Sequence, residues 1–190
     1  MQFNAYSGNG VLLAEALCNL RDDARRSEVE SVLEEHRVGR PRLSPMQLRE
    51  VMGWRSRLRA AFVAPPGEVQ VGVVNALLAE TATRPYVSTH DGQPPHLHYA
   101  DENADVVTRV RAVTAAGVAI ALTEAGPDRL GRCAAPGCEL VFVDVSRNGR
   151  RAYCSRRCAT RVNVTVHRAR STADAGGRPA TRPRAARTGR

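Results

Sequence analysis

Apolar side chains recur at helical spacing through most of the first 126 residues. This pattern predicts helices over residues 7–24, 27–39, 44–64, 68–82 and 101–126. The third is the best marked, because Ser44 can cap its first turn and Gln47 completes a capping box. Gly39 and Gly126 are expected to end the second and fifth helices.

The pattern changes between the fourth and fifth helices. Residues 84–90 and 95–100 flank a turn-forming run, which predicts a β-hairpin. His90, His96 and His98 lie around this hairpin, and positions 96 and 98 share one strand face. Two histidines at that spacing can bind a metal, but no thiol or carboxylate is fixed beside them in the sequence. Ordinary polar histidines are therefore the favoured interpretation.

Two cysteine pairs follow the helical region. Four residues separate Cys133 from Cys138, three separate Cys154 from Cys158, and fifteen lie between the pairs. Such pairs are typical of one structural Zn²⁺ held by four thiolates. A redox dithiol is disfavoured because neither pair is C-x-x-C, and the spacing differs from those common in iron–sulfur proteins. The fifth cysteine, Cys18, is expected in the core on the first helix.

The residues between the pairs predict how this segment folds. Glu139–Ser146 alternate like a strand, Asn148-Gly149 favours a turn, and Arg151–Tyr153 would return toward the second pair as the partner strand. Ser155 is expected to cap a helix that begins within the second pair.

These elements predict an α+β fold with three parts. Residues 1–130 form a mostly helical regulatory or sensor domain with one β-hairpin. Residues 131–170 form a small treble-clef-like zinc finger of knuckle, β-hairpin and helix, and residues 171–190 form a disordered basic tail.

Charge divides the chain in the same way. Residues 1–130 carry 14 Arg against 16 acidic residues, whereas residues 131–190 carry 14 Arg against 3 acidic residues, and the chain has no lysine. This asymmetry indicates a polyanionic partner, nucleic acid before an anionic membrane. Residues 145–173 contain no acid, and their arginines are the predicted nucleic-acid contacts: Arg147, Arg150, Arg151, Arg156, Arg157, Arg161, Arg168 and Arg170.

The last helix is predicted to be two-sided. Arg157, Arg161 and Arg168 share one face at 100° per residue, where they could enter a major groove or line a phosphate backbone. The opposite face is expected to pack on the finger's hairpin, against Val141 and Val143. That apolar face consists of Ala159, Val162, Val166 and Ala169.

Residues 133–161 resemble the CGNR-type zinc finger family. The matching positions are Phe142, Asp144, Ser146, Arg147, Asn148, Gly149, Arg150, Arg151, Cys154 and Ser155. Of the tetrapeptide that names the family, Cys158 and Arg161 are kept and Ala159-Thr160 replaces Gly-Asn. More loosely, the helical region with Val74–Glu80 resembles the domain that precedes this finger in stress-responsive transcription regulators. The resemblance implies DNA binding, although some relatives are described as RNA-binding and zinc-ribbon-like.

Other protein classes are disfavoured. No phosphate-binding loop, nucleophile elbow or paired catalytic carboxylate stands out, so we do not expect an enzyme. The first twenty residues do not resemble a signal peptide, and the longest uncharged apolar run, Ala112–Leu122, is too short to span a membrane.

The sequence thus predicts a cytoplasmic, DNA-binding transcription regulator with one structural Zn²⁺. An RNA-binding protein and a zinc-stabilised protein-interaction module are the alternatives. A small-molecule effector of the helical domain and a homodimer stay open.

Overall fold

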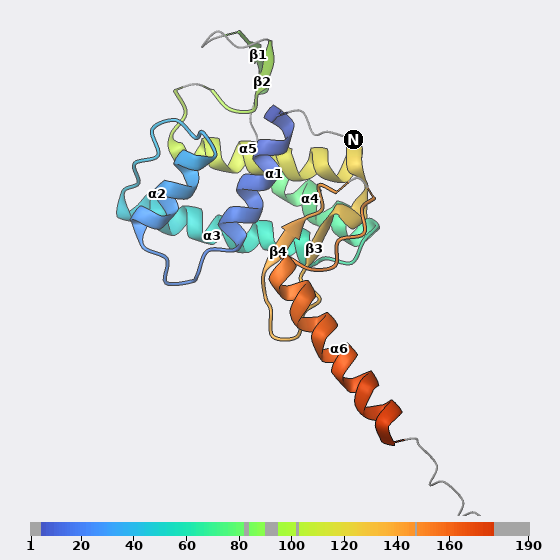
Figure 1. Cartoon of the computed structure of the whole chain (residues 1–190). Helices are drawn as coiled ribbons and strands as arrows, with labels where there is room; N and C mark the ends of the chain where they lie inside the picture. Colours follow the sequence, from blue (N-terminus) through green and yellow to red (C-terminus); the bar gives the residue numbers. More distant parts are fainter. Residues whose placement is uncertain (1–4, 82–83, 90–94, 102, 147, 177–190) are drawn as a thin grey trace, which may run out of the picture.

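The computed structural model of the chain describes residues 5–81, 84–89, 95–101, 103–146 and 148–176, with backbone only at 5–7, 127 and 170–176. The described part is mostly helical, as predicted, and contains two antiparallel hairpins, of which the one at residues 86–98 was predicted (Figure 1). In chain order its elements are α1 (Ala5–Cys18), α2 (Arg26–Glu35), α3 (Pro45–Val63), α4 (Glu68–Thr81), β1 (Tyr86–Ser88), β2 (His96–His98), α5 (Val106–Ile120), β3 (Leu130–Arg132), β4 (Val141–Val143) and α6 (Arg156–Gly176).

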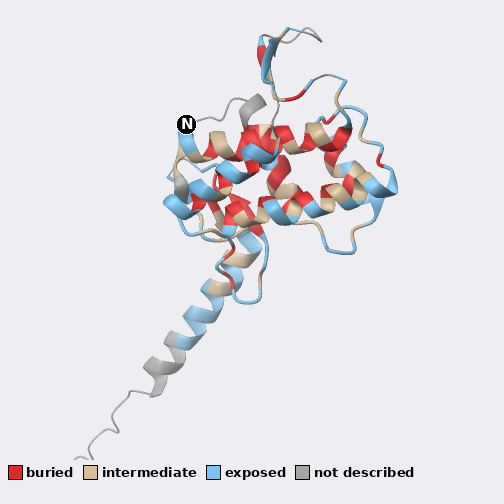
Figure 2. Ribbon diagram, turned by 180° about the vertical axis from the view of Figure 1, so that it is seen from behind, coloured by how far each residue is buried: buried red, intermediate tan, exposed pale blue. Residues whose placement is uncertain are grey.

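Helix α5 is the centre of the helical body. It packs against α1, α3 and α4, and its buried side faces them (Figures 1 and 2). Trp54 of α3 donates its indole N–H to Thr114 Oγ1 over 2.9 Å, which satisfies both polar groups in the core. With the π-helical turn that follows it, the stretch Val106–Ala125 is long and apolar enough to cross a membrane, but 50% of it is buried inside the protein. Its composition is therefore explained by its place in the core.

Helices α1 and α5 cross with their backbones in contact. A Cβ added to Gly10 would lie 2.4 Å from the carbonyl oxygen of Val113, and one added to Gly117 would lie 2.4 Å from the backbone nitrogen of Val11. Neither position has room for a methyl group, so glycine is required at both for this close approach.

The helix ends show where local sequence is decisive. The predicted capping box of α3 is confirmed: Ser44 Oγ accepts from the Gln47 N–H, and Gln47 Oε1 accepts from the Ser44 N–H. Helix α2, by contrast, ends at Glu35 and not at Gly39. Arg37 adopts a left-handed conformation (φ 58°), and the Val38 N–H bonds the Leu33 carbonyl over 2.8 Å, which closes a Schellman turn. Burial of Val38 and Leu33 favours this earlier stop.

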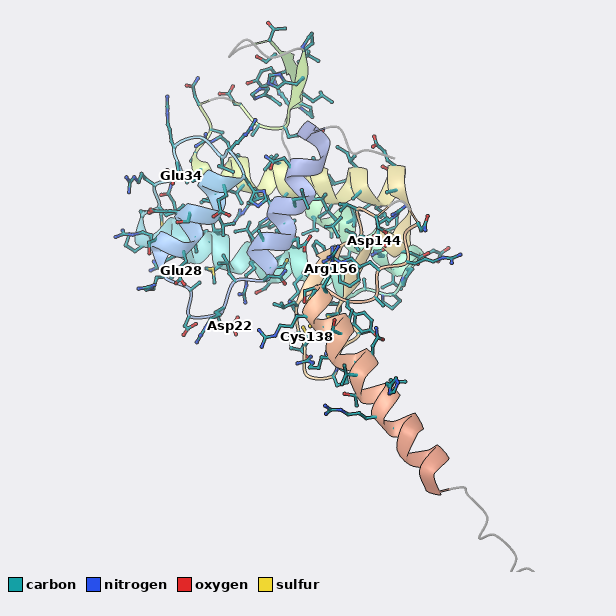
Figure 3. All side chains as sticks on the ribbon, in the orientation of Figure 1. Asp22, Glu28, Glu34, Cys138, Asp144 and Arg156 are labelled. Carbon is teal, nitrogen blue, oxygen red and sulfur yellow. The ribbon has the colours of Figure 1, made fainter. Side chains whose placement is uncertain are left out.

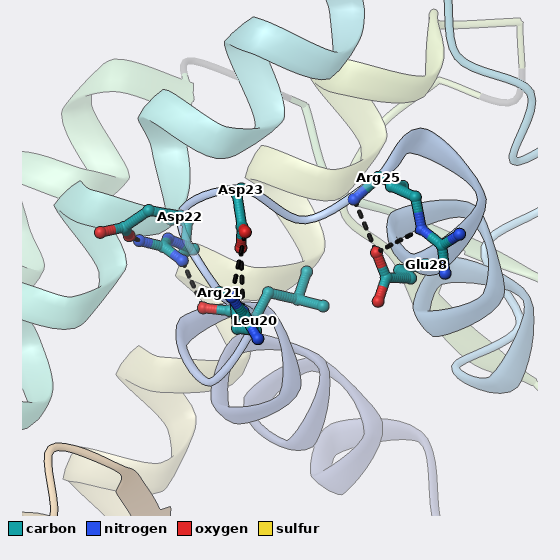
Figure 4. A network of polar contacts seen from close by, with 7 residues as sticks. Leu20, Arg21, Asp22, Asp23, Arg25 and Glu28 are labelled. Atoms are coloured by element: carbon teal, nitrogen blue, oxygen red, sulfur yellow. Dashed lines mark hydrogen bonds and ion pairs between the residues drawn. The ribbon is translucent and has the colours of Figure 1, made fainter.

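Arg55 of α3 holds the loop between α1 and α2. Its guanidinium donates to the carbonyl of Leu20 and to the carboxylate of Asp22 (Figure 4). Further along, Arg25 and Glu28 pair across the first turn of α2, where both side chains are largely exposed. Exposed pairs of this kind contribute little to stability, so Arg55, which is mostly buried, is the more important contact.

The strands of the C-terminal segment pack on the helical body. Leu130, Val141 and Val143 belong to the same buried cluster as the helices, and β3 and β4 contact α1 and α3. The boundary expected after residue 130 therefore falls within β3. Helix α6 then extends away from the body and continues to Gly176, past the predicted start of the tail at residue 171; residues 177–190 lie outside the described part (Figure 1).

The predicted pairing inside this segment was wrong. Strand β4 pairs with β3, upstream of the first cysteine, and not with Arg151–Tyr153. The predicted in–out alternation also fails, because Val141, Phe142, Val143 and Asp144 are all buried. One side of β4 faces the helices, and Arg151 covers the ring of Phe142 on the other.

Candidate metal centre and the helix it anchors

The four cysteines of the two pairs converge at the start of α6. Sγ–Sγ distances are 3.7 Å between Cys138 and Cys154, 3.7 Å between Cys154 and Cys158, and 3.9 Å between Cys138 and Cys158. All four sulfur atoms, including that of Cys133, lie within 4.8 Å of one another. Figure 3 shows Cys138 beside the first turn of α6, at the edge of the helical body.

This spacing fits one tetrahedral zinc ion. Zn–S bonds of about 2.3 Å at tetrahedral angles place the sulfur atoms about 3.8 Å apart, close to the three measured distances. Four soft thiolates are a donor set typical of structural zinc, and they leave no position for substrate. The site is thus suited to holding the fold together, as predicted.

A tight knuckle presents the first pair. The Cys133 N–H bonds the Leu140 carbonyl over 2.9 Å, which continues the β3–β4 ladder, and the Cys138 N–H bonds the Ala135 carbonyl over 3.0 Å. Gly137 adopts a φ of 71°, which an L side chain rarely takes. The Pro-Gly sequence thus allows both sulfurs to face one point.

The first turn of α6 presents the second pair. Ser155 Oγ accepts from the Cys158 N–H over 3.3 Å, so Ser155 caps the helix as predicted. The positive end of the helix dipole favours the thiolate forms of cysteines located there.

The metal-free thiols have unequal proton affinities. Burial opposes ionisation of Cys133, but backbone N–H groups of Cys154 and Ala135 point to its sulfur, and its pKa falls to about 7. Burial, followed by hydrogen bonding to Cys133 and Cys158, raises the pKa of Cys154 to about 12. Four adjacent thiolates therefore need a bound cation, whose charge offsets their repulsion.

A buried carboxylate closes the loop between β4 and the second cysteine pair. Asp144 is fully buried and accepts from the N–H groups of Ser146 and Arg151, each over 2.8 Å (Figure 3). Burial opposes its ionisation, yet these hydrogen bonds and the nearby charge of Arg129 hold its pKa below the usual range. Side-chain hydrogen bonding thus replaces the strand ladder expected here.

Two arginines bond backbone carbonyls around this loop. Arg151 donates to Tyr153 over 2.8 Å, to Val143 over 3.1 Å, and to Cys154. Its guanidinium also lies 5.0 Å from the ring centre of Phe142. Arg129, which the sequence analysis did not single out, donates to the carbonyls of Asp144 and Ser146. Both guanidinium groups are thus used within the fold.

Helix α1 and the turn that follows it supply hydrogen bonds to the open edge of β4. Asn19 donates to the Val141 carbonyl over 3.0 Å and accepts from its N–H over 2.9 Å, while Glu15 accepts from the Val143 N–H over 3.0 Å. Sequence reasoning missed both residues. Their signal was two polar side chains four residues apart in the otherwise apolar stretch of residues 11–20.

Glu15 provides a test of this contact between α1 and β4. Burial raises its pKa, opposed by the Val143 N–H and by Arg151. A raised carboxyl pKa means that the folded protein binds the proton more tightly, so its stability falls as pH rises from the ordinary glutamate pKa through the raised value. Glu15→Gln keeps an acceptor for Val143 without a charge. We expect its advantage over the native protein in urea unfolding to increase as pH rises from the ordinary glutamate pKa through the raised value, by about 0.5 kcal/mol after solvent screening.

The matched control is Glu15→Ala, which removes the acceptor. It should cost about 1–2 kcal/mol, because the Val143 N–H loses its partner, and its pH dependence should be the same as that of Glu15→Gln, since both variants lack the titrating carboxyl. Equal pH dependence for Glu15→Gln and the native protein would contradict this role of the carboxylate.

The predicted nucleic-acid contacts do not share one environment. Exposed side chains are those of Arg150, Arg156, Arg157, Arg161 and Arg168. Arg161 also donates to the Pro136 carbonyl over 3.1 Å, which ties α6 to the knuckle. Arg151 is partly buried within the loop, as described above. Arg147 and the side chain of Arg170 lie outside the described part.

The expected packing of α6 on the hairpin was wrong. Val141 and Val143 are 0% and 1% exposed because α1 and α3 already cover them. Val166, on the apolar face of α6, is instead 42% exposed, and Ala169 is exposed as well. Beyond its first turns α6 stands clear of the body (Figure 2).

The converging thiols, the knuckle and the capped helix define a four-cysteine zinc finger. Residues 129–171 match the CGNR zinc finger family, so the C-terminal segment of this chain is a CGNR zinc finger. The match begins at Arg129, whose guanidinium closes the loop after β4. No curated protein matched the chain.

Proposed function

We propose that this protein is a cytoplasmic transcription regulator that binds duplex DNA through α6. The observation that carries the proposal is a helix anchored at one end by the zinc site and otherwise projecting from the body with exposed arginines. The described side chains of α6, at residues 156–169, include four arginines and no carboxylate, so this part of the helix is strongly positive. The helical body would then be the part that receives a signal.

The geometry suits contact with a groove or with phosphates. Arg157, Arg161 and Arg168 lie within about 40° of one another around the helix axis, by the 100° rotation per residue. Thr165 follows on the same side, and the row is long enough to follow several successive phosphates. Arg150, near the start of the helix, extends the positive surface.

Salt dependence is the first test. If about five phosphates are neutralised, log affinity for duplex DNA should fall with log salt with a slope of roughly −4 to −5. Fluorescence anisotropy of a labelled duplex, measured at salt concentrations from about 50 to about 200 mM, would give this slope. Affinity that does not depend on salt would contradict the proposal.

Arginine variants test whether α6 is the part of the protein that contacts DNA. The double variant Arg157→Gln with Arg168→Gln should make the slope less steep by roughly 2 and weaken binding about tenfold or more. The charge-matched control, Arg49→Gln with Arg84→Gln, removes two exposed arginines of the body and should change affinity little. If both double variants weaken binding equally, the positive charge of the whole chain is responsible and α6 is not the contact.

Two further arms separate the alternatives. A chain truncated after Gly176 should keep most of its duplex binding. Loss of binding in this truncated chain would instead indicate that the tail binds DNA nonspecifically and that the finger serves only protein interaction. Competition with structured RNA should displace the duplex poorly, and preferential displacement by RNA would favour the RNA-binding alternative.

A further inference from the structure

The β1–β2 hairpin presents its polar and apolar faces in an unusual way. Tyr86 pairs with His98 and Ser88 pairs with His96 across the strands, so these four side chains share one face. The opposite face carries Val87 and Leu97, which are 65% and 47% exposed. His96, on the polar face, is only 9% exposed. The hairpin thus shields its histidines and exposes its aliphatic side chains.

The two imidazoles point toward the same place. The Nε2 atoms of His96 and His98 are 2.9 Å apart, and the ring of His98 stacks on Tyr86 with centroids 5.1 Å apart. Stacking against a neighbour restricts the rotation of the His98 ring. The Nε2 atoms of His96 and His98 are therefore held close together on strand β2.

Their separation is informative about a metal. Two nitrogens bound at right angles by bonds of about 2.0–2.1 Å lie about 2.9 Å apart, whereas a tetrahedral ion would separate them by about 3.3–3.4 Å. The observed 2.9 Å, which is spanned by a hydrogen bond between the two rings when no metal is bound, equals the separation of the right-angle case. Imidazole ligands at right angles suit Ni²⁺ and Cu²⁺, which favour square-planar or tetragonal geometry.

The position of the hairpin gives a second reason to expect a ligand. No described residue of β1 or β2 belongs to the buried core cluster of the body, and the hairpin stands apart from it (Figures 1 and 2). An isolated two-stranded hairpin is marginally stable in water. A metal bridging two residues of one strand and recruiting further ligands would stabilise it.

We propose that His96 and His98 form part of a second metal site, distinct from the zinc finger, that takes a divalent ion with right-angle coordination, Ni²⁺ or Cu²⁺. Two protein ligands leave positions open, so the ion exchanges readily, unlike the enclosed zinc.

The test uses the zinc-loaded full chain dialysed against Ni²⁺. We expect nickel to bind one per chain in addition to zinc, measured by elemental analysis of both metals. His96→Gln and His98→Gln should each weaken nickel binding at least tenfold while leaving the zinc content unchanged. His167→Gln, which removes an exposed histidine from α6, is the matched control and should bind nickel like the native protein.

A readout on the native chain avoids dependence on the folding of the variants. Cu²⁺, which is paramagnetic in square-planar and tetragonal geometry alike, should broaden the imidazole NMR signals of His96 and His98 before those of His36 and His167. If the native chain binds no more nickel than His96→Gln or His98→Gln does, or if all imidazole signals broaden uniformly, the proposal is overturned and a simple hydrogen bond between the rings is left.

Discussion

Replacing Gly117 with alanine is expected to destabilise the protein by about 3 kcal/mol. The added methyl group would lie 2.4 Å from backbone atoms of Gly10 and Val11, so α1 and α5 would have to separate. Backbone atoms cannot move aside as a flexible side chain can, and overpacking of a core commonly costs about 1–3 kcal/mol and occasionally more. Urea unfolding at a fixed zinc concentration measures the loss directly.

The chain offers a matched control for this substitution. Gly53 lies within α3 with no atom inside 4 Å of an added Cβ, and its position is exposed. Gly53→Ala should stabilise the protein by about 0.5–1 kcal/mol, through helix propensity alone. If Gly117→Ala were tolerated as well as Gly53→Ala, the close crossing of α1 and α5 would be wrong.

Cys154→Ser is expected to remove the metal and to unfold the finger. Serine is a poor zinc ligand, and binding free energy in small zinc domains is folding free energy, about 10 kcal/mol or more. The zinc content measured by elemental analysis should fall from one zinc per chain to none. Limited proteolysis should then cut within residues 133–158, the knuckle and loop that the metal holds in the native protein.

The fifth cysteine is the control. Cys18 is 3% exposed in the core of α1, and burial raises the pKa of its thiol to about 12. Cys18→Ala should therefore keep the full zinc content, with a loss of stability limited to its packing. Zinc retained by Cys154→Ser, or lost from Cys18→Ala, would contradict the assignment of the ligands.

Zinc loss should also reach the helical body. Val141 and Val143 of β4 belong to the shared core, and Glu15 and Asn19 bond to the edge of that strand. When β4 loosens, α1 loses these partners, so the thermal midpoint of the body is expected to fall with the metal. A body that unfolds at an unchanged temperature would show that the finger is an independent unit.

The sequence predicted those features that depend on nearby residues. The capping box at Ser44, the cap at Ser155 and the four cysteine ligands all follow from residue type at short spacing, which the backbone geometry of helix ends and knuckles dictates. The core position of Cys18 followed from helical periodicity.

Features that depend on distant partners were missed. A strand carries no local signal of its partner, so Val141–Val143 were assigned to the wrong neighbour, and the place of α6 was inferred from that error. The roles of Glu15 and Arg129 likewise arise only when elements far apart in sequence meet. At α2, burial of Val38 decided the helix end over the local preference for Gly39.

The most direct test of the account is duplex binding before and after the zinc is removed from the full chain. In our proposal, the metal orients α6 and the oriented arginines bind DNA. A chelator that removes the zinc should therefore weaken binding of a labelled duplex and make the salt slope less steep than roughly −4 to −5, and added zinc should restore both. A binding curve that is the same with and without zinc would contradict it.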